Sequence, residues 1–238
     1  MVFYPRSMVV LFDIDGTLID HNQAEAIAVA ALRRRLASAE SGDTFLNRWR
    51  TAFERHYIRY LSGELSIQEQ RRERFREVVE PTLSDAAADE LSAAYIDEYL
   101  LACSLYPDVE PALARLTAYR MGIISNGERS QQHGKLARAG IAHYFDALIF
   151  SAECGVAKPA PDIFQLACVA MGVQPSEAVY VGDRQDVDAE AARRAGLRGI
   201  WLDRSAGTHS EDPRTSIDSL LTLPIALALF EGAPEPSA

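Results

Sequence analysis

A run of five apolar residues, Met8–Phe12, leads without interruption into two aspartates, Asp13 and Asp15. Such a short apolar run predicts a strand that is buried on both faces, as in a parallel sheet. Residues two apart on an extended backbone point to the same side, so both carboxylates lie together where the strand ends. Open α/β sheets bind ligands at the carboxyl ends of their strands. This stretch therefore predicts a charged site at the end of a central strand.

Two simpler interpretations of the same stretch are a plain turn and a calcium-binding loop. An aspartate followed by Gly16 is typical of a turn after a strand. A calcium loop requires a glycine at its sixth position and a glutamate at its twelfth. Counted from Asp13, the glycine is the fourth residue and the twelfth is Ala24, so the calcium loop is excluded.

The rest of the sequence predicts an α/β fold with one insertion. Residues 22–101 have helical spacing, few glycines and no strand-like run, and their aromatic residues are expected to form a core. Beyond Tyr106, short apolar runs alternate with helices, which is typical of βαβ units and a parallel sheet. We expect a Rossmann-like core, residues 1–19 and 102–238, and an inserted all-helical cap, residues 20–101, that covers the site as a lid. The expected later strands are 121–124, Ala147–Phe150, Ala178–Val181 and Gly199–Leu202, the last of these ending the sheet, and a helix is expected over Val187–Ala195.

Charge and hydropathy narrow the range of partners. The formal net charge of −10 and the pI near 5.0 argue against nucleic acid. No apolar run is long enough to span a membrane, and Met1–Ser7 lacks the apolar region of a signal peptide. The three cysteines are widely spaced and include no CxxC pair. We expect a cytoplasmic protein without a membrane partner; the sequence leaves its oligomeric state undetermined.

Polar residues follow each of the first four predicted strands. Each group alone has an ordinary explanation as a turn, a loop or a helix cap. Four such groups at the strand ends of one parallel sheet indicate a catalytic site. In chain order they are Asp13 and Asp15, then Ser125 and Asn126, then Lys158, and finally Asp183 with Asp186 and Asp188.

With these motifs the chain resembles the haloacid dehalogenase-like (HAD) hydrolases, in subfamily I with a helical, C1-type cap. The family's D-x-D-G-T-L motif is found at Asp13–Leu18 and its strand-end serine motif at Ile123–Gly127. Its K-P lysine is found at Lys158 and its acidic G-D-x-x-x-x-D motif at Gly182–Asp188. The resemblance covers about residues 8–205, with all four motifs in the expected order.

The resemblance implies a Mg²⁺-dependent phosphatase that acts on a small phosphorylated metabolite. It implies that Asp13 is the nucleophile and forms an aspartyl-phosphate. Asp15 would protonate the leaving oxygen and then deprotonate the attacking water. The magnesium ligands would be Asp13, the backbone carbonyl of Asp15, and Asp183. Lys158 would neutralise the charge of both the phosphate and the carboxylates.

The remaining residues of the motifs are expected to bind phosphate or to support the site. Ser125, the backbone N–H of Asn126 and Lys158 would hold the phosphate, next to a helix N-terminus. Asp188 would orient Lys158 or a metal-bound water, and Thr17 would support the same region. Asp186, inside the acidic motif, is expected to be a solvated or capping residue, and Lys135 is expected to be solvated surface. His21 is expected to be an exposed linker residue rather than a substrate contact. The cap arginines Arg48, Arg55 and Arg59 are expected to form a solvated helix face rather than a binding site for an anionic leaving group.

The residues distinguish this function from most of its alternatives. Haloacid dehalogenases lack an acid two residues after the nucleophile, so Asp15 argues against that branch. Phosphonate cleavage in the family uses a cap lysine, and residues 22–101 contain none. A non-catalytic binding protein would have lost the nucleophile or the metal ligand. A phosphomutase of the β-phosphoglucomutase kind keeps Asp15 and remains an alternative, and the substrate is left open among nucleotides, sugar phosphates and small acid phosphates.

Overall fold

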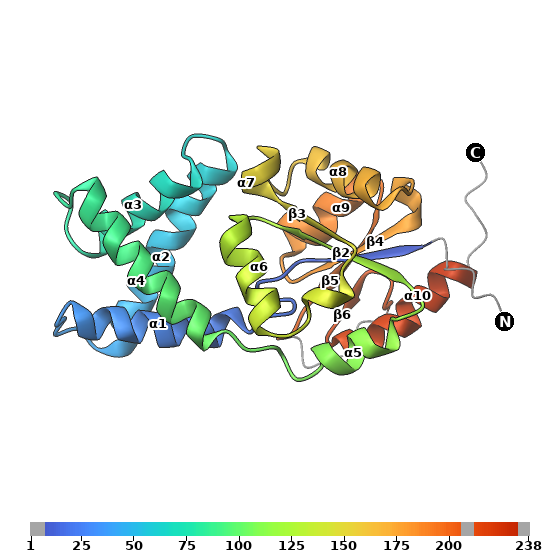
Figure 1. The fold of residues 1–238 in the computed structure, drawn as a ribbon, viewed down its shortest axis with the longest axis horizontal. Coiled ribbons are helices and arrows are strands. Elements are labelled where there is room, and N and C mark those ends of the chain that lie inside the picture. Colours follow the sequence, from blue (N-terminus) through green and yellow to red (C-terminus); the bar gives the residue numbers. More distant parts are fainter. Residues whose placement is uncertain (1–7, 206–211, 233–238) are drawn as a thin grey trace. The chain divides into compact units, whose positions relative to one another are not determined.

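The computed structural model describes residues 8–205 and 212–232, and the chain divides into two compact units (Figure 1). An α/β unit is formed by the chain up to Asp20 together with the chain from Leu105 onward. A helical unit is formed by His21–Ser104. The expectation about Met1–Ser7 lies outside the described residues. No helix in the described part of the chain has the length and hydropathy needed to cross a lipid bilayer.

The α/β unit is built on a parallel sheet of six strands in the order β3-β2-β1-β4-β5-β6. The strand formed by the opening apolar run lies in the middle, between β2 and β4, and its four residues are fully buried. The strand order changes direction at β1, and this is where α/β sheets bind ligands. The strands are β1 (Val9–Phe12), β2 (Arg120–Ser125), β3 (Ala147–Phe150), β4 (Ala178–Gly182), β5 (Arg198–Leu202) and β6 (Ser216–Ile217).

The predicted parallel sheet is confirmed, but its predicted end at Gly199–Leu202 is wrong. A sixth strand, β6, pairs with β5 through Trp201 and Leu202. It consists of two residues, Ser216 and Ile217, which is too short for any periodicity to show in the sequence.

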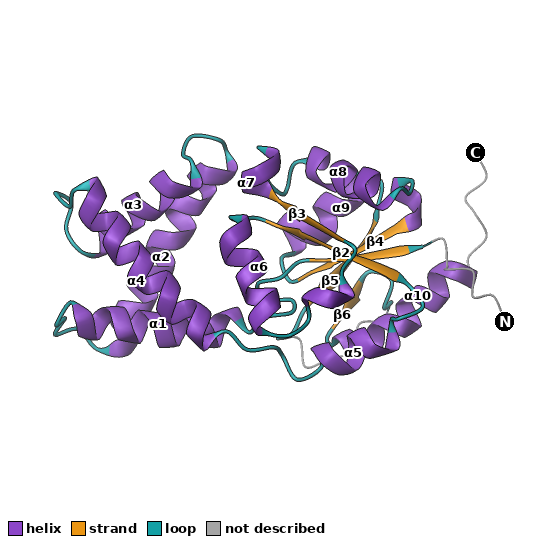
Figure 2. Ribbon diagram, viewed as in Figure 1, coloured by secondary structure: helices purple, strands orange, loops and turns teal. Residues whose placement is uncertain are grey.

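Helices cover both faces of the sheet (Figure 2). α8 and α9 lie on one face and form a core with Val9, Leu11 and Tyr180, while α5 and α10 lie on the other. The helix predicted over Val187–Ala195 instead begins as a π-helix and continues as α9, and a short helix, α7, follows β3. The elements are α5 (Val109–Arg115), α6 (Arg129–Arg138), η1 (Ala142–Tyr144), α7 (Ser151–Cys154), α8 (Pro161–Met171), η2 (Pro175–Glu177), η3 (Gln185–Ala189), α9 (Glu190–Arg194), η4 (Leu220–Thr222) and α10 (Leu223–Gly232).

The helical unit contains α1 (His21–Arg35), α2 (Gly42–Leu61), α3 (Ile67–Val78) and α4 (Asp85–Ala102). Serine side chains cap the last three of these helices; at the start of α3, Ser66 and Glu69 form a reciprocal capping box. The rings of Trp49, Phe75 and Tyr95 pack together, with the guanidinium of Arg74 4.3 Å from the Trp49 ring. The aromatic residues therefore form the core of this unit, as expected.

Candidate active site

The order of the strands explains why residues far apart in the sequence meet at one place. Asp13 follows β1, Ser125 ends β2 and Asp183 follows β4, and β2 and β4 are the two neighbours of β1. Since the strands are parallel, their carboxyl ends lie at the same edge of the sheet. Lys158, from the loop that precedes α8, is inserted among these groups with only 3% of its surface exposed.

Among the described residues, the ammonium group of Lys158 has three hydrogen-bond partners, all of them oxygens. Its Nζ lies 2.7 Å from Oδ1 of Asp13, 2.6 Å from Oδ1 of Asp188 and 2.7 Å from the hydroxyl of Tyr180. A buried lysine is stable only when its charge is paired. The two carboxylates raise the pKa of Lys158 despite the opposing effect of burial, so the side chain is a fixed cation beside Asp13.

Both oxygens of Asp188 are occupied by protein groups. Oδ1 accepts hydrogen bonds from Lys158 and from the Tyr180 hydroxyl, and Oδ2 accepts one from the backbone N–H of Arg184 at 3.0 Å. If Asp188 orients Lys158, the two side chains must be in contact, and they are.

The carboxylates of Asp13, Asp183 and Asp188 form a cluster in which one oxygen from each lies within 4.8 Å of the others. Among the described residues, no donor is hydrogen-bonded to the Asp183 side chain. Hard carboxylate oxygens are the donors that Mg²⁺ prefers. Because the oxygens of Asp188 are already engaged, Asp13 and Asp183 are the members of the cluster that best fit a divalent cation.

The electrostatics of the cluster also fit a cation. Burial raises the pKa of Asp13 to about 7; Lys158 opposes this rise, and the carboxylates of Asp188 and Asp15 add to it. Burial, followed by the charge of Asp13, raises the pKa of Asp183 to about 8. These carboxyls resist ionisation because negative charge is crowded in a poorly solvated place, and a bound cation would relieve that crowding.

Two contacts fix the position of Asp183. The indole N–H of Trp201 on β5 donates to its backbone carbonyl at 2.9 Å. On the other side, Gly16 has a φ of +83°, and a Cβ there would overlap the Asp183 carboxylate. The glycine of the first motif thus permits both a left-handed turn and the close approach of the acidic motif.

Asn126 joins the end of β2 to the loop that carries Lys158. Its side-chain amide donates to the carbonyl of Lys158 at 2.9 Å and accepts from the backbone N–H of Lys158 at 2.8 Å. The side chain thus positions the lysine. Its backbone N–H is the group expected to contact the phosphate.

The expectation that Lys135 is solvated surface is wrong. This residue of α6 is 2% exposed, and its Nζ lies 2.7 and 2.6 Å from the two carboxylate oxygens of Asp15. The sequence contained a signal, since Lys135 and Lys158 are the only lysines in a chain that otherwise uses arginine. Both lysines share that rarity, but the helical period of the sequence does not show what lies against Lys135.

Tyr180 and Arg204 also contact the motifs and were not predicted to do so. Tyr180 lies inside the apolar run of β4, where it resembles any strand residue. Arg204 donates to the Thr17 carbonyl at 2.7 Å and binds both oxygens of Asp108 at 3.0 Å. It thereby fixes the backbone of the loop after Asp15. The Thr17 hydroxyl is buried and has no hydrogen-bond partner among the described residues.

Residues of the helical unit that were considered for substrate contact make contacts within that unit. His21 is the first residue of α1 rather than a linker residue, and its Nδ1 lies 2.8 Å from the Tyr99 hydroxyl. The cap arginines form ion pairs, Arg48 with Glu40, Arg55 with Glu77 and Arg59 with Glu64. In the α/β unit, the Asp186 side chain is 71% exposed, as expected for a solvated residue.

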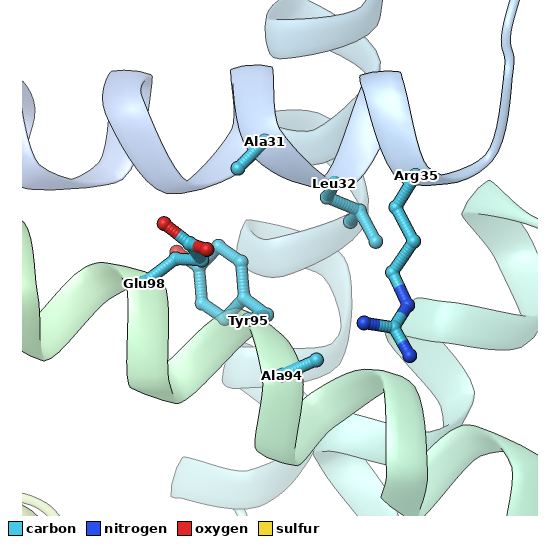
Figure 3. A pocket seen from close by; sticks show the side chains of 6 residues that line it. All are labelled: Ala31, Leu32, Arg35, Ala94, Tyr95 and Glu98. Atoms are coloured by element: carbon cyan, nitrogen blue, oxygen red, sulfur yellow. The ribbon is translucent and has the colours of Figure 1, made fainter.

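A pocket of about 120 Å³ lies between α1 and α4 of the helical unit (Figure 3). Its lining combines apolar side chains and the Tyr95 ring with the charged ends of Arg35 and Glu98. None of the lining residues is a predicted site residue, and none belongs to the carboxylate cluster. The lining residues are Ala31, Leu32, Arg35, Ala94, Tyr95 and Glu98.

Comparison with known proteins gives a consistent result. Residues 8–196 match the haloacid dehalogenase-like hydrolase family. Glyceraldehyde 3-phosphate phosphatase of Methanopyrus kandleri is 34% identical over 218 residues, which is 88% of this chain and 92% of that enzyme. N-acylneuraminate-9-phosphatase of Rattus norvegicus is 29% identical over 235 residues, 93% of this chain and 94% of that enzyme. Phosphoserine phosphatase of Thermus thermophilus is 42% identical, but the match of 116 residues spans 48% of this chain and 46% of that enzyme.

Solved structures have the same fold. A HAD-hydrolase of Bacillus subtilis bound to magnesium superposes with a TM-score of 0.79 at 21% identity, covering 93% of this chain and 99% of that one. A 2-haloacid dehalogenase of Pseudomonas syringae superposes with a TM-score of 0.68 at 28% identity, covering 94% and 99%.

Proposed function

The chain belongs to the haloacid dehalogenase-like hydrolase family, and we propose that it is a Mg²⁺-dependent phosphatase that hydrolyses a small phosphorylated metabolite through an aspartyl-phosphate on Asp13. The observation that carries the proposal is the contact of 2.7 Å between Lys158 and Asp13 inside a carboxylate cluster. A carboxylate beside a fixed cation can accept a phosphoryl group, because in-line phosphoryl transfer depends mainly on positioning and charge neutralisation. The relatives in Methanopyrus and Rattus are named as phosphatases and match nearly their whole length, which supports the same reaction.

In the first step, a carboxylate oxygen of Asp13 attacks phosphorus and the bond to the leaving oxygen breaks. The proton of Asp15 passes to that oxygen, so an alcohol leaves rather than an alkoxide. Lys158, charged and held in place by Asp188 and Tyr180, stabilises the charge that develops on the phosphoryl oxygens.

In the second step, a water molecule attacks the phosphorus of the aspartyl-phosphate. Asp15, now ionised, takes a proton from this water, and the bond between phosphorus and the Asp13 oxygen breaks. Inorganic phosphate leaves, and both aspartates return to their initial states. Asp13 and Asp183, with the backbone carbonyl of Asp15, would hold Mg²⁺, which would supply positive charge that favours attack on an anionic phosphate.

Phosphate binding is assigned to the end of β2. The hydroxyl of Ser125, which is 1% exposed, and the backbone N–H of Asn126 would donate to phosphoryl oxygens. α6 begins at Arg129, directly after this segment, and a helix N-terminus favours an anion. We propose that the helical unit, residues 20–101 in the sequence-based division, selects the substrate.

Asp15 separates this proposal from haloacid dehalogenation, although a 2-haloacid dehalogenase has the same fold. A departing halide needs no proton, whereas an alkoxide does, so an acid two residues after the nucleophile is useful only for the ester. A phosphomutase would use the same residues and is an outcome of the test below.

The test is hydrolysis of p-nitrophenyl phosphate with and without Mg²⁺, comparing the wild type with Asp13→Asn. We expect magnesium-dependent release of nitrophenol that Asp13→Asn lowers by at least about 10³-fold while circular dichroism stays unchanged. Turnover by the variant would remove Asp13 as the nucleophile. Phosphoserine, glyceraldehyde 3-phosphate and an N-acylneuraminate 9-phosphate are the first metabolites to screen. Failure to release phosphate from any ester, combined with interconversion of sugar phosphates, would instead indicate a mutase.

A further inference from the structure

α6 presents two buried polar side chains to the end of the sheet. Gln132 and Lys135 lie three residues apart, so they are on the same face of the helix, and each is 2% exposed. No family motif quoted above includes either residue. A long side chain loses rotational freedom when it is buried, and a buried ion pair adds little to stability. Stability alone therefore does not explain why Gln132 and Lys135 are buried here, and we look for the reason in the chemistry of the site.

Lys135 fixes the carboxylate of Asp15 through both of its oxygens. The distances from Nζ are 2.7 and 2.6 Å, and the side chain of Asp15 is 28% exposed against 3% for Lys135. The lysine thus holds the carboxylate from the protein side while part of Asp15 stays accessible. A carboxyl group held in this way has a defined direction in which to give or take a proton.

Gln132 connects this group to the predicted phosphate site. Its Nε2 donates to the Ser125 hydroxyl oxygen at 2.7 Å and lies 3.1 Å from Oδ2 of Asp15. Because Ser125 accepts this hydrogen bond, its own proton is kept for donation to another acceptor, as phosphate binding requires. At Gly127 a Cβ would lie 3.2 Å from Cγ of Gln132, so a larger residue there would require a small shift of this side chain.

We propose that Lys135 and Gln132 are positioning residues that hold the acid–base group Asp15 and the phosphate-binding hydroxyl of Ser125 as one unit; this inference rests on the proposed function. Both residues act through Asp15 and Ser125, and neither takes part in the bonds that form and break. In the transfer step the proton travels from Asp15 to the leaving oxygen, and in hydrolysis one travels from water to Asp15. Lys135 donates hydrogen bonds to the carboxyl group of Asp15 and so sets where it points.

Leaving-group dependence tests this role. Nitrophenolate is a stable anion that leaves without a proton, whereas the alkoxide of glycerol 2-phosphate requires one. The parameter kcat/KM covers the reaction up to the first irreversible step, which is transfer to Asp13, and so isolates the step in which the alcohol leaves. We expect Lys135→Met to lower kcat/KM for glycerol 2-phosphate by roughly 10²-fold and for p-nitrophenyl phosphate by less than about tenfold.

Four further variants complete the experiment. Asp15→Asn should likewise lower kcat/KM more for glycerol 2-phosphate than for p-nitrophenyl phosphate. In the double variant Asp15→Asn/Lys135→Met, the difference between the two losses should be no larger than in Asp15→Asn alone, because both changes remove the same function. Arg138→Met removes an exposed charge from the same helix and should leave both values unchanged. If Lys135→Met does not fold, Lys135→Gln keeps a hydrogen-bond donor and serves for the same comparison.

The outcomes distinguish the positioning role from the proposed function. Equal losses for both esters, or additive effects in the double variant, would overturn the positioning role while leaving the phosphatase intact. Absence of hydrolysis of either ester by the wild type, or full activity of Asp13→Asn, would overturn the proposed function and this inference with it.

Discussion

Lys158 and Asp188 meet at 2.6 Å between Nζ and Oδ1, and the Tyr180 hydroxyl contacts both of these atoms. The same hydroxyl lies 3.1 Å from the backbone carbonyl of Ile124 on β2. A lysine from a loop is thus tied to β4, to β2 and to the acidic motif at once. This triangle makes the cation beside Asp13 a fixed part of the sheet edge rather than a mobile surface charge.

Removing the Tyr180 hydroxyl should destabilise the fold. Tyr180→Phe leaves the buried Lys158 and Asp188 with one partner fewer each, and we expect a loss of about 1–3 kcal/mol in the free energy of unfolding. Urea denaturation measures this loss. Tyr144→Phe is the matched control, because the Tyr144 hydroxyl has no hydrogen-bond partner among the described residues. An equal loss in both variants would mean that the triangle contributes nothing particular to stability.

The two aspartates of the acidic motif should differ in their effect on metal binding. Asp183→Asn removes a carboxylate that has no hydrogen-bond donor among the described residues, and Mg²⁺ affinity should fall at least about tenfold. Asp188→Asn changes a carboxylate whose oxygens already contact Lys158, Tyr180 and Arg184, so the affinity should fall less. Calorimetric titration with Mg²⁺ distinguishes them, and the reverse order would assign the ligand role to Asp188.

Substitution of Gly16 should damage the site beyond its effect on the backbone. Alanine at a φ of +83° costs about 1–2 kcal/mol, and its Cβ would also displace the Asp183 carboxylate. Gly155→Ala is the control, since Gly155 has a φ of +70° with open space around it. Both variants should lose similar stability in urea denaturation, but we expect only Gly16→Ala to lose Mg²⁺ affinity. Unchanged Mg²⁺ affinity in Gly16→Ala would contradict the close approach.

The ion pair between Asp108 and Arg204 should make stability depend on pH. Burial opposes ionisation of Asp108, but hydrogen bonds from Arg204, the Leu220 N–H and Ser219 outweigh it and lower its pKa below the ordinary 3.8. Because the folded state has the lower pKa, this contribution is complete above about pH 4 and disappears as the pH falls through the folded pKa. Asp108→Asn should therefore lose about 1–3 kcal/mol at neutral pH, and the difference from wild type should shrink in acid.

Urea denaturation between pH 7 and pH 3 measures this difference. Asp212→Asn provides the comparison, because Asp212 is paired with Arg214 but both are solvent-exposed, and we expect no measurable change. A difference for Asp108→Asn that stays constant over this range would show that its charge is not what stabilises the fold.

The sheet and the order of its motifs were predictable because they depend on local patterns. The apolar run before Asp13 can be stable only when both faces are covered, and the later apolar runs alternate with helices in the same way. Parallel strands then bring their carboxyl ends to one edge, so Asp13, Ser125 and Asp183 could be grouped without coordinates. β6 could not be predicted, since its two residues pair only because β5 is already in place.

The residues that support the catalytic groups could be identified only from the tertiary structure. Lys135, Gln132 and Tyr180 are polar residues within a helix or strand, where the period gives the face but not what lies against it. Lys135 is buried because α6 packs beside the loop of Asp15, 120 residues away in the sequence. The sequence by itself therefore determined which residues carry the charges of the site. The tertiary structure decided which side chains hold those charged groups in place. The physical reason is that the energy of a buried ion pair or hydrogen bond depends on long-range contacts, which no local sequence pattern encodes.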